Sequence, residues 1–150
     1  MRLSRILLKR PFVKIVISDI KKDKSLIVQE EINPEDLDLD IGVMHFPENL
    51  QFKAEVWREG NDLNINAHVE GERQFTCSLC LEEFENLFEK DITLHYDIKG
   101  LDSVTIDQDV RDEIILDHPI RILCRPDCRG LCPFCGANLN AEPCECKSQD

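Results

Sequence analysis

The chain has 150 residues, of which 42% are hydrophobic, and it carries a formal net charge of −12. This length suffices for one sizeable hydrophobic core with a small appendage. No apolar run approaches the roughly 20 residues that a transmembrane helix needs, so we expect no membrane association. An acidic chain also repels phosphate backbones over its general surface, which argues against a broad nucleic-acid-binding face.

The charge is unevenly distributed. Residues 1–24 contain eight Lys and Arg against two Asp, a local charge of +6, whereas residues 25–150 contain ten basic and 28 acidic residues, a charge of −18. Residues 1–10 combine charges with a short apolar run and lack a small-residue cleavage site, so we expect no export signal and a cytoplasmic protein. If the chain touches nucleic acid directly, the basic N-terminal segment is the predicted contact; a solvated segment with one strand explains it equally well.

The N-terminal part predicts two strands before an irregular stretch. Residues 12–18 are rich in β-branched side chains and predict the first strand, and residues 26–28 begin a second. Residues 31–40 are acidic and contain Pro34. That composition predicts a loop or a short turn.

A β-hairpin is predicted in the middle of the chain. Residues 51–56 and 62–70 each alternate apolar with polar side chains, the period of a half-buried strand. Gly60 and Asn61 lie between them and tolerate the positive φ that tight hairpin turns need.

The alternation continues towards the helix. We interpret Glu70-Gly71-Glu72 as a second tight turn and residues 73–77 as a third strand, and residues 84–98 alternate again. Residues 109–117 predict one short helix, which Pro119 ends. The predicted fold is therefore mainly β (α+β), an antiparallel meander or partly open barrel with one short helix.

Three parts of the chain follow from this reading. They are a basic N-terminal segment with the first strand (1–24), a β-rich core (25–123) and a cysteine-rich, irregular tail held by metal (124–150).

The eight cysteines have the spacing of metal ligands. One C-x₂-C pair precedes a longer group by about forty residues; together they are Cys77, Cys80, Cys124, Cys128, Cys132, Cys135, Cys144 and Cys146. Tetrahedral zinc takes four thiolates, and eight ligands divide into two closed Cys₄ sites. In a reducing cytosol this spacing favours metal over disulfides. Iron is the alternative metal for a Cys₄ site.

Several pairings of these cysteines are open. Locality favours a compact site from Cys132, Cys135, Cys144 and Cys146, because only eight residues separate its two pairs, and leaves Cys77 and Cys80 to join Cys124 and Cys128. The competing arrangement joins the four cysteines at 124, 128, 132 and 135, and interleaved arrangements are further alternatives.

The predicted sites are structural and no catalytic residue is expected. A closed all-thiolate site offers no open position for water or substrate. The four histidines, His45, His68, His95 and His118, are scattered and are interpreted as surface residues. The Cys132-Pro133-Phe134-Cys135 segment resembles a redox dithiol, but Gly136 and flanking cysteines favour a metal knuckle.

The ordered motifs resemble the YceD family of large ribosomal RNA subunit accumulation proteins. They are C-x₂-C-L-E-x-F at residues 77–84, D-E-I-I-L-x₂-P at 112–119 and C-x₃-C-x-G-L-C-P-x-C-G-x-N-L-N-x₃-C-x-C at 124–146. The resemblance extends from about residue 50 to 146, and residues 16–20 are similar to the family's usual beginning. Some members lack the last four cysteines but keep ligand-type residues at the first four, which supports the pairing that locality favours.

The resemblance implies a ribosome-biogenesis factor with no enzymatic activity, which supports the synthesis, processing or stability of large-subunit ribosomal RNA. The expected partner is a pre-ribosomal particle, contacted through a ribosomal protein or through the RNA, with no small-molecule substrate. The alternative is a zinc-ribbon protein–protein adaptor unrelated to ribosome assembly.

Overall fold

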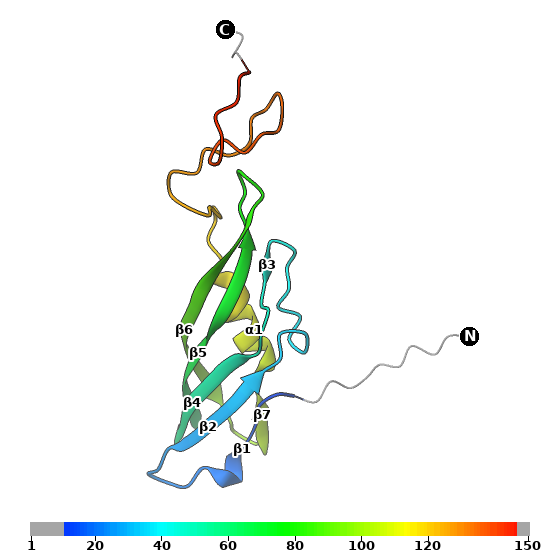
Figure 1. Ribbon diagram of the computed structural model, residues 1–150. Coiled ribbons are helices and arrows are strands. Elements are labelled where there is room, and N and C mark those ends of the chain that lie inside the picture. Colours follow the sequence, from blue (N-terminus) through cyan, green and yellow to red (C-terminus); the bar gives the residue numbers. More distant parts are fainter. Residues whose placement is uncertain (1–10, 147–150) are drawn as a thin grey trace, which may run out of the picture.

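The computed structural model describes residues 11–146 (Figure 1). Its elements in chain order are β1 (Lys14–Val16), η1 (Ile17–Asp19), β2 (Leu26–Ile32), β3 (Met44–His45), β4 (Leu50–Glu59), β5 (Asp62–Thr76), β6 (Glu83–Asp97), β7 (Ser103–Thr105) and α1 (Asp107–Leu116). The predicted mainly antiparallel β structure with one short helix is confirmed. Within residues 11–146 the main sheet stays open and does not close into a barrel.

Strand β5 organises the sheet. β6 pairs along the whole of β5, from Asp62↔Asp97 to Thr76↔Glu83. On the other edge, β4 pairs with the first part of β5, β3 pairs with Phe75 and Gln74 near its end, and β2 adds to the free edge of β4. β1 and β7 form a separate two-stranded sheet. The β5–β6 hairpin therefore extends beyond β4, and the cysteine-rich tail follows it at its far end (Figure 1).

The predicted β4–β5 hairpin is confirmed. β4 ends at Glu59 and β5 begins at Asp62, so Gly60 and Asn61 form a two-residue loop. Gly60 has a φ of 62°, the left-handed region that favours glycine. Asn61 has no positive φ, so only the glycine uses the freedom expected of both.

The second predicted turn, at Glu70-Gly71-Glu72, is wrong. β5 passes through Gly71 without interruption and pairs it with Phe88. A Cβ built on Gly71 would lie 2.4 Å from Cδ2 of Leu50, which is fully buried. Glycine at this position leaves room for the Leu50 side chain to approach the backbone of the strand, which is one reason why glycine occurs within strands.

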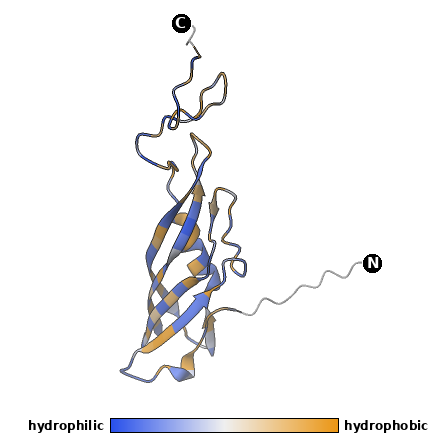
Figure 2. Cartoon of the chain, viewed as in Figure 1, coloured by the Kyte–Doolittle hydropathy of each residue, from blue (hydrophilic) through white to orange (hydrophobic). Residues whose placement is uncertain are grey.

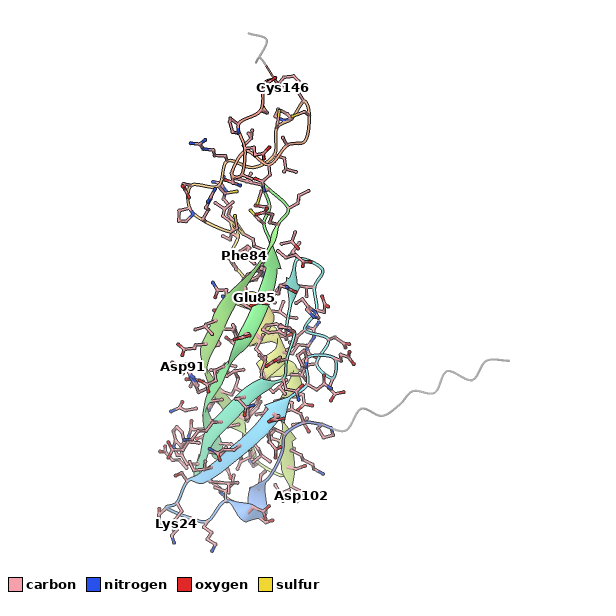
Figure 3. All side chains as sticks on the ribbon, viewed as in Figure 1. Lys24, Phe84, Glu85, Asp91, Asp102 and Cys146 are labelled. Carbon is pink, nitrogen blue, oxygen red and sulfur yellow. The ribbon has the colours of Figure 1, made fainter. Side chains whose placement is uncertain are left out.

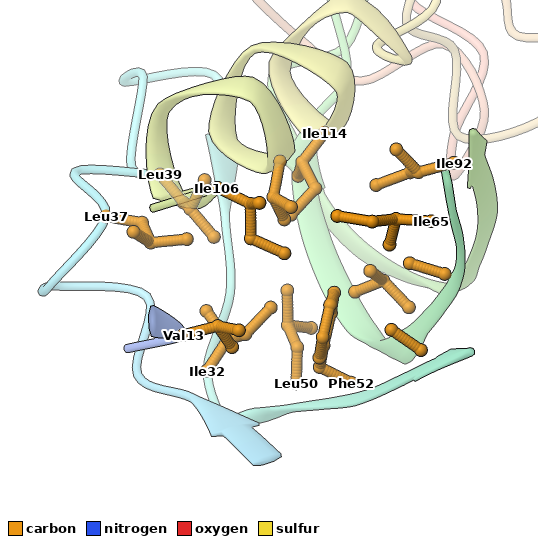
Figure 4. Close-up of a cluster of buried hydrophobic side chains, with 14 of the residues drawn as sticks. Val13, Ile32, Leu37, Leu39, Leu50, Phe52, Ile65, Ile92, Ile106 and Ile114 are labelled. Atoms are coloured by element: carbon orange, nitrogen blue, oxygen red, sulfur yellow. The ribbon is translucent and has the colours of Figure 1, made fainter. Parts of the chain in front are cut away.

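The core lies between the inner face of the sheet and α1. Alternate residues of β4 and β5 point inwards, as the period of two predicts, and Figure 2 shows the matching alternation of hydropathy along the strands. Val110 and Ile114 of α1 are fully buried against them. In Figure 4, Ile65 and Ile92 of the sheet face Ile114 across this core.

Polar contacts fix both ends of α1, which begins two residues earlier than predicted. The Asp107 carboxylate accepts hydrogen bonds from the backbone N–H groups of Phe12 (2.9 Å) and Val13 (3.2 Å). The last turn of α1 contains no basic residue, and Asp117 follows it as the C-cap. A negative charge at this end is unfavourable, because the helix dipole is also negative there. Arg73 offsets this charge with an ion pair to Asp117 at 3.2 Å.

The N-terminal segment takes part in the core. Four of its side chains are at most 7% exposed, namely Val13, Ile15, Ile17 and Ile20. Of the first strand predicted over residues 12–18, Lys14–Val16 form β1, whereas Ile17–Asp19 form the 3-10 turn η1, so the end of that prediction is wrong. The basic residues at positions 2, 5, 9 and 10 lie outside the described residues. The division of the chain at residues 24 and 123 stays a prediction.

Within the described residues, no helix is long and apolar enough to cross a membrane.

Gly71→Ala should lower the free energy of unfolding by about 1–3 kcal/mol, the usual range for overpacking a core. The measurement is urea unfolding followed by the fluorescence of Trp57, the one tryptophan of the chain. Leu50→Ala removes the opposing methyl group. The loss of unfolding free energy in the double variant should therefore be smaller than the sum of the losses in the two single variants. Strict additivity would contradict the proposed close approach.

Candidate metal centres

The structure divides the eight cysteines into two tetrads. Cys77, Cys80, Cys124 and Cys128 form the first tetrad, and Cys132, Cys135, Cys144 and Cys146 form the second tetrad. In each, the four Sγ atoms lie within 4.8 Å of one another, so each tetrad could hold a metal ion. This is the division that sequence locality favours. Figure 3 shows sulfur atoms at the turn of the β5–β6 hairpin and in the tail beyond it, with Cys146 far from the sheet.

The first tetrad joins two distant parts of the chain. Cys77 and Cys80 lie in the turn between β5 and β6 and are almost fully buried, whereas Cys124 and Cys128 follow α1. Cys77 Sγ lies 3.7 Å from Cys128 Sγ, and Cys80 Sγ lies 3.6 Å from Cys124 Sγ. Ser78 reinforces the junction, since its backbone N–H and its hydroxyl both donate to the Ile122 carbonyl at 2.8 Å.

The second tetrad is contained within the tail and is more open to water. Cys132 is buried, Cys144 is half-buried, and Cys135 and Cys146 are exposed. A single antiparallel bridge joins Leu131 to Asn138. It is the one isolated bridge within the described residues, so regular pairing contributes little here. This matches the expected irregular tail.

Both C-x₂-C turns have the same backbone design. In the second, Gly136 N–H donates to the Cys132 carbonyl (2.9 Å) and Cys132 N–H to the Ala137 carbonyl (2.8 Å). In the first, Leu81 N–H donates to the Cys77 carbonyl (3.0 Å) and Cys77 N–H to the Glu82 carbonyl (2.8 Å).

Leu81 and Gly136 therefore occupy equivalent positions. Their φ angles are 61° and 72°, both in the left-handed region. Glycine adopts this region freely, whereas an L-residue such as leucine adopts it at a cost of about 1–2 kcal/mol.

Backbone amides favour a thiolate at one cysteine of each tetrad. Burial alone would raise the pKa of Cys77, but the N–H groups of Cys80, Cys124 and Leu79 outweigh it and lower that pKa to about 6. The N–H groups of Cys135 and Phe134 lower the pKa of Cys132 to about 6 as well.

Two of the other thiols, those of Cys124 and Cys146, resist ionisation when no cation is near. Burial, together with the nearby Cys80 and Cys128 sulfurs, raises the pKa of Cys124 to about 12. The Cys135 sulfur raises the pKa of Cys146 to about 12, and burial adds to this. Four negative sulfurs within a few ångströms therefore require a cation among them, which is the chemistry of a metal centre.

The sulfur distances fit tetrahedral coordination. Four sulfurs at about 2.3 Å from a central ion are separated from one another by about 3.8 Å. The 3.6 and 3.7 Å separations in the first tetrad are close to this value. Its residues therefore fit a four-coordinate ion.

A histidine cluster on the open face of the sheet differs from the tetrads. His68, Glu70 and Glu89 come within 4.8 Å of one another, a juxtaposition that the sequence did not predict. His68 is half-buried and both glutamates are exposed. His68 Nδ1 lies 2.7 Å from the neighbouring Asp91, and its Nε2 lies 3.7 Å from Glu70. The Asp91 carboxylate raises the pKa of His68. The contacts are those of a surface ion-pair cluster.

Sequence reasoning missed three residues around the tetrads. Leu81 appeared only as a motif residue, although alignment of the two C-x₂-C turns places it at the position of Gly136. Asn138 and Asn140 were quoted only as part of a motif. In the structure Asn138 donates to Glu82 and Asn140 donates to the sulfur of Cys128.

Comparison with known proteins confirms the resemblance for the motifs at residues 112–119 and 124–146, whereas the motif at residues 77–84 lies outside the matched segment. A family model described as large ribosomal RNA subunit accumulation protein YceD matches residues 97–150. This segment contains α1 and six of the eight cysteines. No solved structure matches the chain.

The matches to curated relatives are also short, between 42 and 59 residues. An uncharacterized protein of Mycobacterium tuberculosis is 43% identical over 42 residues, 28% of this chain and 20% of that protein. Proteins named large ribosomal RNA subunit accumulation protein YCED homolog 1, chloroplastic, are 42% identical over 48 residues in Zea mays and 36% identical over 59 residues in Arabidopsis thaliana. These cover 31% and 38% of this chain and 16% and 17% of the plant proteins. The matches thus span a fifth or less of the relatives' length.

The left-handed backbone at Leu81 leads to a prediction. Leu81→Gly should leave the free energy of unfolding unchanged or raise it by up to about 1 kcal/mol, because relief of strain exceeds the entropy cost of glycine. Leu81→Val should lower it, since a β-branched residue fits this region poorly. Urea unfolding of the metal-loaded protein measures both.

The matched control is Leu79→Gly in the same turn, where φ is not positive. It should destabilise the protein. Equal losses for Leu81→Gly and Leu79→Gly would contradict the role given to the backbone of Leu81.

Proposed function

We propose that this chain, whose residues 97–150 match the YceD family, is a non-enzymatic ribosome-biogenesis factor that supports the accumulation of large-subunit ribosomal RNA. The family match carries the proposal, and the names of the two plant relatives agree with it. We further propose that the protein acts on the synthesis, processing or stability of this RNA and that it does so in the cytoplasm.

The proposal assigns one structural zinc ion to each tetrad. All eight cysteines, Cys77, Cys80, Cys124, Cys128, Cys132, Cys135, Cys144 and Cys146, serve as ligands. Four thiolates close the coordination sphere, so the ion stabilises the fold and leaves no position for a substrate. Zinc suits a tetrahedral thiolate set, and iron is the competing metal. The closed sphere supports a role without catalysis.

The surface charge favours a basic protein as the direct partner. β4, β5 and β6 carry ten acidic residues, all exposed, whereas only Lys53 and Arg58 are exposed basic residues on these strands. Such a surface repels RNA and attracts the basic segments that accompany it in a ribosomal particle. We therefore place association through a ribosomal protein ahead of direct binding to RNA.

Removal of the protein from its host should test the function directly. Sucrose gradients of a deletion strain should show a depleted large-subunit peak and less mature large-subunit RNA. The wild-type chain should restore both, and so should Leu116→Ser, which changes an exposed side chain at the end of α1. A chain that lacks Cys77 and Cys80 should not. A normal gradient in the deletion strain would favour an adaptor outside ribosome assembly.

The two proposed zinc sites should have unequal roles. Elemental analysis should give two zinc ions per wild-type chain and one in Cys77→Ser or Cys144→Ser. Cys77→Ser should destabilise the whole domain, because the first tetrad joins the β5–β6 turn to the segment after α1 and its binding energy is partly folding energy. Cys144→Ser should loosen the tail and leave a cooperative unfolding transition.

Equal loss of the core transition in both variants would contradict this assignment. Iron in place of zinc in the purified protein would contradict the assignment of zinc.

Direct RNA binding, if measurable, should depend on the basic N-terminal segment. The test replaces its eight Lys and Arg residues by Gln, because truncation at residue 24 would also remove the buried Val13 and Ile15. The variant should lose gel-shift affinity for free RNA at low salt, since neutralised phosphates set that affinity, yet keep its association with pre-ribosomal particles.

The control replaces the three exposed arginines that follow α1, Arg121, Arg125 and Arg129, by Gln. Tight, salt-insensitive RNA binding by the N-terminal variant would contradict the electrostatic argument. It would indicate base stacking or base recognition.

A further inference from the structure

Two asparagines of the second tetrad's own loop reach the first tetrad, one at a cysteine sulfur and the other at a residue beside the first C-x₂-C turn. Asn138 and Asn140 lie between Cys135 and Cys144, so metal binding at the second tetrad constrains both ends of their loop. Asn140 Nδ2 nevertheless donates to Cys128 Sγ of the first tetrad at 3.3 Å. Asn138 Nδ2 donates to Glu82 Oε1, next to the first C-x₂-C turn, at 2.7 Å.

The amide of Asn140 is held in one orientation. Its Oδ1 accepts a hydrogen bond from the backbone N–H of Arg129 at 2.8 Å. Its Nδ2 also donates to Asn138 Oδ1 at 3.0 Å, and Asn138 Oδ1 accepts the backbone N–H of Asn140 at 3.0 Å. A flipped amide would direct oxygen at oxygen and at sulfur. The network therefore aims an N–H group at the Cys128 sulfur.

The backbone brings the same loop against the first tetrad. Leu139 N–H donates to the Gly130 carbonyl at 2.9 Å. Gly130 has a φ of 71°, and a Cβ there would lie 3.1 Å from the carbonyl oxygen of Leu79, inside the first C-x₂-C turn. No side chain larger than hydrogen fits between them without a shift. The loop that carries Asn138 and Asn140 thus connects the second tetrad to the first.

We propose that Asn140 is a positioning residue of the first metal centre and that the second centre, by holding the loop of Asn140, sets the metal affinity of the first. The inference rests on the proposed metal sites. An N–H donor spreads the negative charge of a thiolate and fixes its direction towards the ion. Outer-shell partners of this kind typically change metal affinity 10- to 100-fold. Neither tetrad is then independent of the other.

The first test uses Asn140→Asp in the full chain. Aspartate keeps the acceptor for Arg129 N–H and loses the donor to sulfur. Asn86→Asp adds the same charge at an exposed position of β6 and serves as the matched control. In protein loaded with cadmium-113, each tetrad should give its own NMR signal. Replacement of the four cysteines of the second tetrad by Ser identifies the signal of the first.

Asn140→Asp should shift the signal of the first tetrad and lower the zinc affinity of that site roughly 10- to 100-fold in chelator competition. Asn86→Asp should change neither, and Trp57 fluorescence should report an intact core in both. A wild-type signal and affinity in Asn140→Asp would overturn the role of Asn140. Equal losses in Asn86→Asp would overturn it too, because they would trace the effect to charge alone.

The second test concerns the link between the sites. The chain with four Ser in the second tetrad should bind zinc at the first tetrad about 10- to 100-fold more weakly than wild type. Addition of Asn140→Asp to that chain should then have little further effect. An unchanged affinity in the four-Ser chain would overturn the link. A wild-type chain that binds neither zinc nor cadmium would overturn the proposed metal sites themselves, a result distinct from these.

Discussion

The contact between the β5–β6 turn and the segment after α1 is the constraint on which the rest of the structure depends. Here Cys77 and Cys80 are buried beside Cys124 and Cys128, and Ser78 bonds to Ile122. The tail has almost no regular pairing of its own, so its path from α1 onwards is fixed by this junction. Without an ion, four adjacent thiols gain little from their proximity. With one, the same geometry joins sheet, helix and tail.

Helix α1 connects this junction to the opposite end of the chain. Its first turn holds the backbone of Phe12 and Val13, and its last turn is held by Arg73 of β5. Arg73 is only 12% exposed and also stacks over Phe75 and Phe88. A cation placed in this way neutralises the helix terminus and fills apolar space at once. The N-terminal segment and the tail, which lie far apart in the sequence, are therefore linked through one helix.

The elements set by local periodicity were predictable, and those set by distant neighbours were not. Alternation predicted the long strands because burial on one face follows directly from a period of two. Gly71 was misread because glycine permits a turn and also permits close approach, and only Leu50 decides between them. The start of α1 at Asp107 depends on backbone groups 94 and 95 residues away. No local pattern reports such a partner.

In the candidate site, too, features set by local sequence were predictable and those set by the folded backbone were not. Ligand types and spacing were visible, because thiolate chemistry requires cysteines at short intervals. The left-handed Leu81 was hidden because leucine rarely adopts that conformation. Asn140 could be recognised as a neighbour of Cys128 only once the loop that carries it was folded back over the first tetrad.

The separation of the two halves of the first tetrad along the chain affects the order in which the protein is made. Cys80 precedes Cys124 by 44 residues. At ordinary rates of translation this interval lasts roughly 2 to 9 s. During it the β5–β6 hairpin can pair while two thiols wait without their partners. The newly made chain therefore carries Cys77 and Cys80 without their partners until Cys124 and Cys128 have been synthesised, and a four-coordinate ion can close its coordination only after that point.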